Sequence, residues 1–99
     1  MVVAAISVAP VGTKTTSISS YVRDCLRVLD KHKNLKYELT PMATVIEGSL
    51  DEILEVVKEM HEVTFSKGVM RVLTHITIDD RRDKKLTMHG KVEAVMKHK

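Results

Sequence analysis

The first stretch of the chain alternates between two kinds of position. Residues 2–9, VVAAISVA, carry the larger apolar side chains mainly at even positions, and small side chains predominate at odd positions. A period of two is typical of a β-strand whose two faces meet different surroundings. The face with small side chains permits close approach by another surface. Residues 10–17, PVGTKTTS, then predict a turn.

A helix is predicted next, because apolar residues recur at spacings of three and four. These residues are Ile18, Val22, Cys25, Leu26 and Leu29. Thr16 or Ser17 is the expected cap, since a hydroxyl oxygen accepts from the free N–H groups of the first helical turn. Basic side chains in residues 30–34, DKHKN, suit the negative end of the helix dipole, so the helix is expected to end there.

Two short strands and a second helix follow. Residues 35–40, LKYELT, alternate between apolar and polar, Pro41 ends the run, and residues 42–48, MATVIEG, predict the returning strand of a β-hairpin. Ser49, with Glu52 three positions later, matches a capping box. The apolar stripe of the helix that they start consists of Leu50, Ile53, Leu54, Val57 and Met60.

The last long strand is predicted over residues 69–80, after a break marked by Gly68. Its even positions are mostly apolar, and its odd positions mix polar and apolar side chains. Thr87 is expected to cap a short final helix. The order β-α-β-β-α-β, followed by one more helix, predicts an α+β ferredoxin-like sandwich with an additional C-terminal helix, and residues 1–99 are expected to form a single domain.

In this fold the helices are expected to cover one face of the sheet and to leave the other face open. The open face would carry Ala5, Ser7, Arg71, Leu73 and His75. Small and apolar side chains on an uncovered face favour association with another copy of the chain. We therefore expect a homo-oligomer built through sheet-to-sheet or edge-strand contacts.

Composition narrows the classes of partner. The chain has 99 residues, 43% of them hydrophobic and 29% charged, with a net charge of +3. Its basic residues are interleaved with 13 acidic ones, and only three aromatic residues are present, so nucleic acid is not indicated as a partner. No stretch approaches the roughly 20 apolar residues of a membrane helix, and the first residues lack the pattern of a signal peptide. We expect a cytoplasmic protein without a membrane partner.

Motifs for catalysis and metal binding are missing from the sequence. There is no phosphate-binding glycine loop, no paired-cysteine motif and no Gly-x-Ser-x-Gly turn. The five histidines lie on different predicted elements without the short spacing of zinc ligands. The single cysteine, Cys25, falls in an apolar helical pattern and is interpreted as a small core residue. No catalytic residue, metal site or cofactor is predicted.

Two candidate binding features remain open from the residues alone. The hydroxyl-rich residues 13–17 lie between the first strand and the first helix, where they either bind an anion or a polar ring or simply cap the helix. Glu47, at the end of a strand, either binds hydrogen-bond donors of a ligand or is a solvated strand end. Arg71 opens the last strand on the uncovered face, where we expect it to pair with an acid across a subunit interface.

The segment TIDDRRDKK, residues 77–85, concentrates charge at the end of the last strand. Asp79 and Asp80 point to opposite faces of a strand, so they do not form a catalytic pair. We expect Arg81 and Arg82 to bridge to acids on the same or a neighbouring chain, as an assembly element. Binding of a small anion by these arginines and Lys84 is the second possibility.

Three segments carry a resemblance to a known family. They are PVGTKTTSISSYV (residues 10–22), YELTPMATVIEGSLDEI (residues 37–53) and RVLTHITIDDRRDKKLTMHGKVEAV (residues 71–95). In these segments, which cover most of the chain, the sequence resembles the YkoF-like thiamine-binding protein family, and in length and element order it is similar to the single-domain archaeal and yeast members.

This resemblance implies a fold, an assembly and a ligand. The implied fold is ferredoxin-like, forming dimers through open sheets and then tetramers as dimers of dimers. The implied function is non-catalytic binding of thiamine or its hydroxymethylpyrimidine part. The marked positions of the family pattern fall on Pro10, Gly12, Thr13, Ser17, Tyr37, Met42, Thr44, Glu47, Asp80, Arg81, Arg82 and Asp83. Ala43 stands where the family pattern has glycine.

The combined prediction comprises two sets of site residues. The ligand-binding set is Thr13, Ser17, Tyr37, Met42, Thr44 and Glu47, and the anion or interface set is Arg71, Asp80, Arg81, Arg82 and Lys84. One alternative function is an anion-responsive regulatory or assembly subunit. The other is an acylphosphatase-like hydrolase, which is less favoured because such an enzyme needs an Arg and an Asn at a phosphate cradle, and residues 9–17 contain neither.

Overall fold

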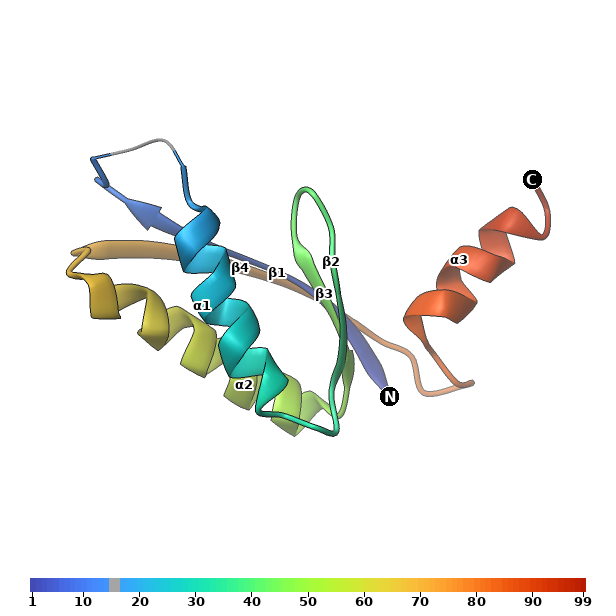
Figure 1. Cartoon of the computed structure of the whole chain (residues 1–99). Coiled ribbons are helices and arrows are strands. Elements are labelled where there is room, and N and C mark those ends of the chain that lie inside the picture. The colour runs from blue at the N-terminus through green and yellow to red at the C-terminus, as the bar shows by residue number, and fades with distance from the viewer. Residues whose placement is uncertain (15–16) are drawn as a thin grey trace.

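The computed structural model describes residues 1–14 and 17–99, and its elements follow the predicted order. The elements are β1 (Val2–Val11), α1 (Ser19–Asp30), β2 (Lys36–Leu39), β3 (Thr44–Gly48), α2 (Leu50–Thr64), the 3-10 turn η1 (Phe65–Lys67), β4 (Arg71–Asp80) and α3 (Met88–Met96). The strands form one antiparallel sheet in the order β2-β3-β1-β4 (Figure 1). This order interleaves two split β-α-β units, and it confirms the α+β ferredoxin-like fold.

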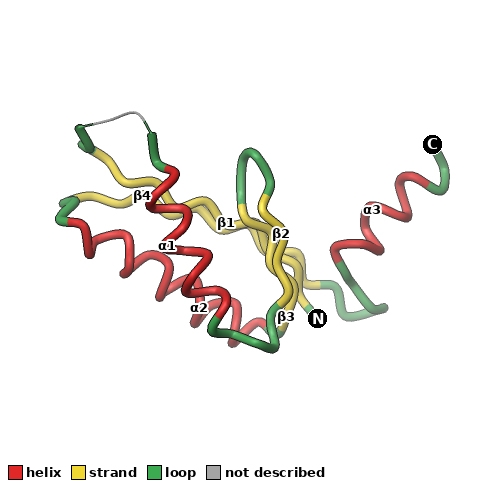
Figure 2. The backbone as a smooth tube through the Cα atoms, in the orientation of Figure 1, coloured by secondary structure: helices red, strands yellow, loops and turns green. Residues whose placement is uncertain are grey.

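Helices α1 and α2 pack together on one face of the sheet (Figure 2). Between these two layers lies the main hydrophobic core, formed by Val2, Ala4, Ile6, Cys25, Val28, Leu29, Leu35, Ile46, Ile53, Val56, Val57 and Met60. Ile46, Ile53 and Val56 are completely buried. The even positions of β1 therefore face the core, as the alternating pattern predicts.

The strand register confirms the predicted division of β4 into two faces. Ile6 lies opposite Ile76 on the helix side of the sheet, whereas Ser7 lies opposite His75 on the other side. Residues directly opposite each other in an antiparallel pair share a face. Odd positions of both long strands thus make up the face away from α1 and α2.

The boundaries of all four strands differ from the prediction, and β2 and β3 are shorter than predicted. Pro10 and Val11 belong to β1 rather than to the following turn, and β4 begins at Arg71 rather than at residue 69. Pro10 is tolerated in the strand because β1 has no second neighbour at that point, so its missing N–H breaks no ladder there.

The helix caps were predicted correctly at two starts and wrongly at one. The Ser49 hydroxyl accepts from the N–H of Glu52 at 3.3 Å, and the Thr87 hydroxyl accepts from the N–H of Gly90 at 2.9 Å. The first helix has Ile18 at its cap position with no side-chain capping bond, so Ser17 is not the cap. The Ser17 hydroxyl instead shares a hydrogen bond of 3.0 Å with the Ser19 hydroxyl. Thr16, the other predicted cap, lies outside the described residues.

The last helix changes the expectation that helices cover one face only. Leu86 and Met88 are buried against Val3 and Val45, which lie on the face away from α1 and α2. This contact forms a second, smaller core at one end of that face. From there α3 extends past the end of the sheet (Figure 1), and its remaining apolar side chains are exposed.

Candidate functional site

The candidate site lies where β3 leaves β1. The ladder between β1 and β3 ends at the pair Ile6 and Thr44, whereas the ladder between β1 and β4 continues to Val11. From Ser7 onward β1 therefore has a neighbouring strand on one side only. Backbone N–H and C=O groups on the other side are strong hydrogen-bonding groups without a ladder partner. This part of β1 is an internal free edge that can bind the polar edge of a ligand.

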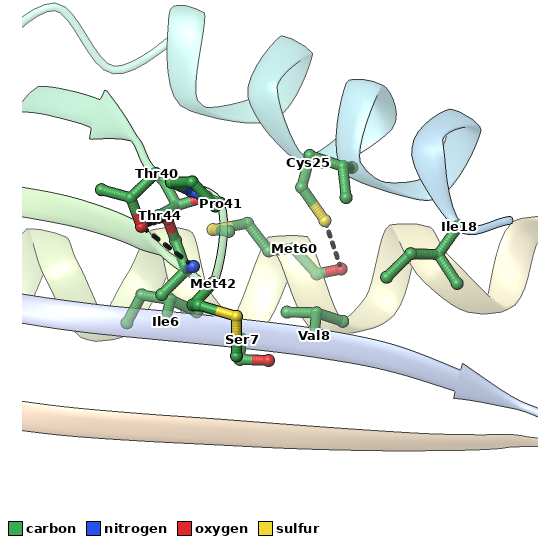
Figure 3. A pocket seen from close by; sticks show the side chains of 12 residues that line it. Ile6, Ser7, Val8, Ile18, Cys25, Thr40, Pro41, Met42, Thr44 and Met60 are labelled. Atoms are coloured by element: carbon green, nitrogen blue, oxygen red, sulfur yellow. Dashed lines mark hydrogen bonds between the residues drawn. The ribbon is translucent and has the colours of Figure 1, made fainter.

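A cavity of about 110 Å³ opens beside this free edge, between α1 and the turn that joins β2 to β3 (Figure 3). Its walls are formed by Ile6, Ser7, Val8, Ile18, Val22, Cys25, Thr40, Pro41, Met42, Ala43, Thr44 and Met60. Apolar cavities of about 150 Å³ in other proteins hold benzene. The cavity is therefore on the scale of one six-membered ring.

Cys25 and Met60 form the apolar base of the cavity. The Cys25 thiol donates to the Met60 carbonyl oxygen at 3.7 Å and lies 3.9 Å from the Thr64 hydroxyl (Figure 3). Burial raises the pKa of the Cys25 thiol. The side chain is 4% exposed, which confirms its interpretation as a small core residue.

This environment predicts an unreactive thiol. We expect iodoacetamide at pH 7.5 to alkylate Cys25 at least about tenfold more slowly in the folded protein than in urea, because the reactive thiolate is disfavoured and inaccessible. Mass spectrometry of timed samples measures both rates on the same residue. Equal rates in the two conditions would contradict the buried position.

The turn between β2 and β3 is held by three hydrogen bonds between two residues. The Thr40 N–H and hydroxyl donate to the Ala43 carbonyl oxygen at 2.9 and 2.8 Å, and the Ala43 N–H donates to the Thr40 hydroxyl at 3.1 Å. The turn carries Met42, which is 87% exposed and extends toward β1 at the rim of the cavity (Figure 3). Met42 is thus free to move over a bound ring, while the turn that holds it is fixed.

Thr44 supplies a polar group to the cavity wall. Its side chain is only 6% exposed, and its hydroxyl forms no hydrogen bond within residues 1–14 and 17–99. The described residues contain no fully buried side-chain oxygen that lacks a partner, so this hydroxyl is open to the cavity, where it can donate to or accept from a ligand. The neighbouring Ala43 also lines the cavity.

The structure does not bring the six predicted ligand residues together. Met42 and Thr44 line the cavity, whereas Thr13 and Ser17 line a second hollow between the end of β1 and the start of β4. Tyr37 lies on β2, where its hydroxyl donates to Asp30 at 2.6 Å. This hydrogen bond raises the pKa of Tyr37.

Glu47 lies on the other face of the sheet from Thr44. It is opposite Val3 in the strand register, and its side chain is 5% exposed. No hydrogen bond or ion pair to its carboxylate occurs in the described part of the chain. Because the two side chains point to opposite faces, one small ring cannot contact both Thr44 and Glu47.

Several cavity residues were not predicted, namely Ser7, Val8, Val22 and Thr40. One signal for them is present in the sequence. The first predicted strand is longer than the returning strand of the hairpin, so part of it must lack a partner on that side. Comparing the lengths of strands that become neighbours would have pointed to Ser7 and Val8.

The predicted anion or interface residues fall at opposite ends of β4. Arg71 begins the strand and Asp80 ends it, and Arg81, Arg82 and Lys84 follow. Arg82 donates to Asp80 at 2.8 Å, and Arg81 donates through two N–H groups to Asp83 at 2.5 and 2.9 Å. Both arginines thus bridge to acids of their own chain.

Lys84 lines a hollow with Arg81 and Asp80 at the end of β4. Hydrogen bonds from the arginines lower the pKa values of Asp80 and Asp83. A carboxyl group whose pKa is lowered by folding stabilises the folded state at pH values above the pKa that the group has in the unfolded chain. This stabilisation is lost as the pH falls through the pKa that the group has in the folded state.

The Arg81 contact predicts a selective pKa change. Replacing Arg81 with Ala is expected to raise the pKa of Asp83 toward its ordinary value, because the two donated hydrogen bonds are lost. Carbon-13 NMR titration of the aspartate carboxyls measures this change. Arg82→Ala is the matched control, since it should raise the pKa of Asp80 and leave that of Asp83 in place. A shift of both carboxyls in both variants would contradict the pairing.

The residues that the structure describes contain no group of three His, Cys, Asp or Glu side chains placed to hold a metal ion. None of their helices combines the length and the apolar character that crossing a membrane requires.

Comparison with known proteins gives a consistent result. A family model described as thiamine-binding protein matches residues 4–96. The UPF0045 protein YqgV of Bacillus subtilis is 46% identical over 99% of this chain and 97% of its own. The crystal structure of hypothetical protein MJ1052 from Methanocaldococcus jannaschii has a TM-score of 0.88 and 42% identity, covering 96% of this chain and 95% of that one.

A more distant structure shows the same fold. It is a candidate thiamine biosynthesis/salvage protein from Thermotoga maritima, with a TM-score of 0.78 and 23% identity, covering 95% of this chain and 97% of that one. At this identity the similarity speaks for the fold alone.

Proposed function

Because this chain belongs to the thiamine-binding protein family, we propose that it binds thiamine or a hydroxymethylpyrimidine-type heterocycle without catalysing a reaction, in the cavity between α1 and the β2–β3 turn. The observation that carries this proposal is the position of a one-ring cavity beside the free edge of β1. A strand edge offers alternating N–H and C=O groups to whatever lies next to it.

The chemistry of an aminopyrimidine matches this edge. The ring has hydrogen-bond acceptors at its nitrogens and a donor at its amino group, so it can pair with neighbouring backbone groups of β1. The Thr44 hydroxyl adds one more partner from β3. The apolar base at Cys25 and Met60 accommodates the ring carbons, and Met42 covers a ring face. A cavity of about 110 Å³ holds one ring, so the remainder of thiamine would lie outside it.

Calorimetric titration with thiamine, hydroxymethylpyrimidine and inorganic phosphate in parallel tests the proposal. Ligands that prefer the folded state also raise its melting temperature, so thermal shifts provide a second readout. We expect heat and stabilisation with both pyrimidine compounds. Absence of binding by either one at millimolar concentration would overturn the proposal. A response to phosphate alone would favour an anion-responsive subunit, with Arg81 and Lys84 as its first candidates.

A pair of threonine variants locates the site. Thr44→Val removes the cavity hydroxyl while keeping the shape of the side chain, and we expect about 5- to 100-fold weaker binding of hydroxymethylpyrimidine. Thr77→Val is the control, because Thr77 lies on a strand of the same sheet but points to the opposite face. Equal affinities in the two variants would place the ligand elsewhere.

We also propose that the protein is a homo-oligomer, specifically a tetramer arranged as a dimer of dimers. The part of the open face that α3 leaves uncovered supports association, since Leu73 is 43% exposed there and small side chains of β1 lie beside it. Sedimentation velocity measures the oligomeric state. Arg81→Ala is expected to weaken the oligomer more than ligand binding, and an unchanged sedimentation profile would argue against a role for Arg81 in assembly.

A further inference from the structure

The six methionines of the chain differ widely in their access to solvent. Met60 and Met88 are buried, with exposed fractions of 2% and 7%, whereas Met42 and Met70 are 87% and 92% exposed. Met42 and Met60 line the cavity between α1 and the β2–β3 turn, and Met70 lines the second hollow instead. The cavity therefore has a protected thioether at its base and an accessible thioether at its rim.

The backbone around Met42 determines where the accessible thioether lies. Thr40 and Ala43 close the β2–β3 turn through three hydrogen bonds of 2.8 to 3.1 Å, so the turn is held in one conformation. From this turn the Met42 side chain extends toward β1 at the mouth of the cavity (Figure 3). A sulfur atom at this position meets dissolved oxidants and also contacts a ligand that enters the cavity.

We propose that Met42 is a site of reversible oxidation that regulates ligand binding in this cavity, an inference that rests on the proposed function. The oxidant is a peroxide. Hydrogen peroxide transfers one oxygen atom to the Met42 sulfur, its O–O bond breaks and water leaves, so the sulfur loses the two electrons that the peroxide gains. A methionine sulfoxide reductase reverses the change, because two thiols form a disulfide while the sulfoxide oxygen leaves as water.

Oxidation changes the chemistry at the mouth of the cavity. The unmodified thioether of Met42 offers an apolar and polarisable surface to the face of a ring. A sulfoxide oxygen is a strong hydrogen-bond acceptor, and it loses hydrogen bonds to water when a ring covers it. The oxidised side chain is therefore a poor cover for a ring, and the ligand binds more weakly.

The cavity also contains donors for the sulfoxide oxygen. The hydroxyl groups of Ser7 and Thr44 line its wall, and the part of β1 beyond Ile6 presents backbone N–H groups without a ladder partner on that side. These groups are the ones proposed to bind the polar edge of the ligand. Because methionine has three rotatable side-chain bonds, oxidised Met42 can turn toward these donors and compete with the ligand for them.

Peroxide treatment followed by peptide mass spectrometry measures the oxidation of each methionine separately. We expect Met42 and Met70 to be oxidised at comparable rates, at least about tenfold faster than Met60. Saturating hydroxymethylpyrimidine is expected to slow the oxidation of Met42 at least about fivefold, because the bound ring covers its sulfur. Met70 is the internal control and should keep its rate. An unchanged rate at Met42 in the ligand-bound protein would overturn the proposal.

Two leucine variants connect oxidation to affinity. After peroxide treatment we expect wild-type protein and Met70→Leu to bind hydroxymethylpyrimidine at least about tenfold more weakly than before it. Methionine sulfoxide reductase with dithiothreitol should restore most of the affinity. Met42→Leu has no sulfur at the rim, so its affinity should be the same before and after treatment, whatever its initial value. An equal loss of affinity in treated Met42→Leu would overturn the assignment to Met42.

The outcomes separate this proposal from the proposed function. Calorimetry measures each affinity, and thermal unfolding checks that the treated proteins stay folded. If untreated protein binds hydroxymethylpyrimidine and protein oxidised at Met42 binds it equally well, the regulatory role of Met42 is overturned and the binding function stands. If untreated protein binds neither pyrimidine compound, the binding function is overturned, and the role of Met42 with it.

Discussion

Replacing Val8 with Phe is expected to weaken hydroxymethylpyrimidine binding at least about 100-fold while the protein stays folded. Val8 projects from the free part of β1 into the cavity, toward Cys25 and Ile18 (Figure 3). A phenyl ring at this position occupies the space of about 110 Å³ that the ligand ring would fill. The added ring also buries apolar surface, which offsets much of the cost of crowding the cavity.

Val11→Phe is the matched control for this prediction. Val11 lies on the same strand but lines the second hollow rather than the cavity. We expect Val11→Phe to bind hydroxymethylpyrimidine with nearly the wild-type affinity. Calorimetry measures both affinities, and thermal unfolding checks that both variants fold. Wild-type affinity in Val8→Phe would show that the ligand does not occupy the cavity.

The largest effect on stability is expected from Ile53→Ala. Ile53 is completely buried in the core between α2 and the sheet, and removing its side chain leaves a cavity that the surroundings only partly fill. Comparable substitutions lower the free energy of unfolding by about 2–5 kcal/mol. For a domain of this size each kcal/mol corresponds to a decrease of about 4–8 °C in melting temperature. The loss is a large share of the total, since domains are typically stable by only about 5–15 kcal/mol.

The neighbouring Leu54 provides the control, because it is 46% exposed on the same helix. Leu54→Ala makes the same kind of truncation without opening an internal cavity, so we expect a loss below about 1 kcal/mol. Urea denaturation at one fixed protein concentration measures both variants, which removes the effect of assembly on apparent stability. Similar losses in the two variants would contradict the packing of α2.

Much of the fold was predictable from local patterns. The alternation in residues 2–9 identified the strand and its core face, and Ser49 and Thr87 identified two helix starts. These features depend on the period of side-chain direction and on hydrogen bonds within a few residues. Cys25 was also interpreted correctly, because its position in the helical stripe determines that it faces the core.

The errors arose where distant parts of the chain decide the outcome. Ser17 matched a capping residue, yet the helix begins at Ser19, with Ile18 at the cap position and no side-chain capping bond. The end of β1 was placed too early because Pro10 normally interrupts a ladder, and it is accepted only since β1 has a single neighbour there. The end of β1 thus depends on how this strand meets the rest of the sheet.

In the candidate site, too, some features follow from the local sequence and others arise only from the fold. Alternation along β3 already implies that Thr44 and Glu47 point to opposite faces, so their separation was contained in the sequence. The cavity itself was not, because it exists only where the ladder between β1 and β3 stops after Ile6 while β4 continues. The part of β1 that extends beyond β3 becomes an edge for binding once the two strands are neighbours.

The sequence by itself determined which segments become strands and helices and which side chains face the core, because steric preferences and side-chain periodicity act within a few residues. Tertiary structure alone decided the strand order, the free stretch of β1 and the exposure of the β4 edge. These features depend on pairing between segments far apart in the chain. The physical reason is that a backbone hydrogen-bonding group is satisfied or left free only by the strand that lies beside it.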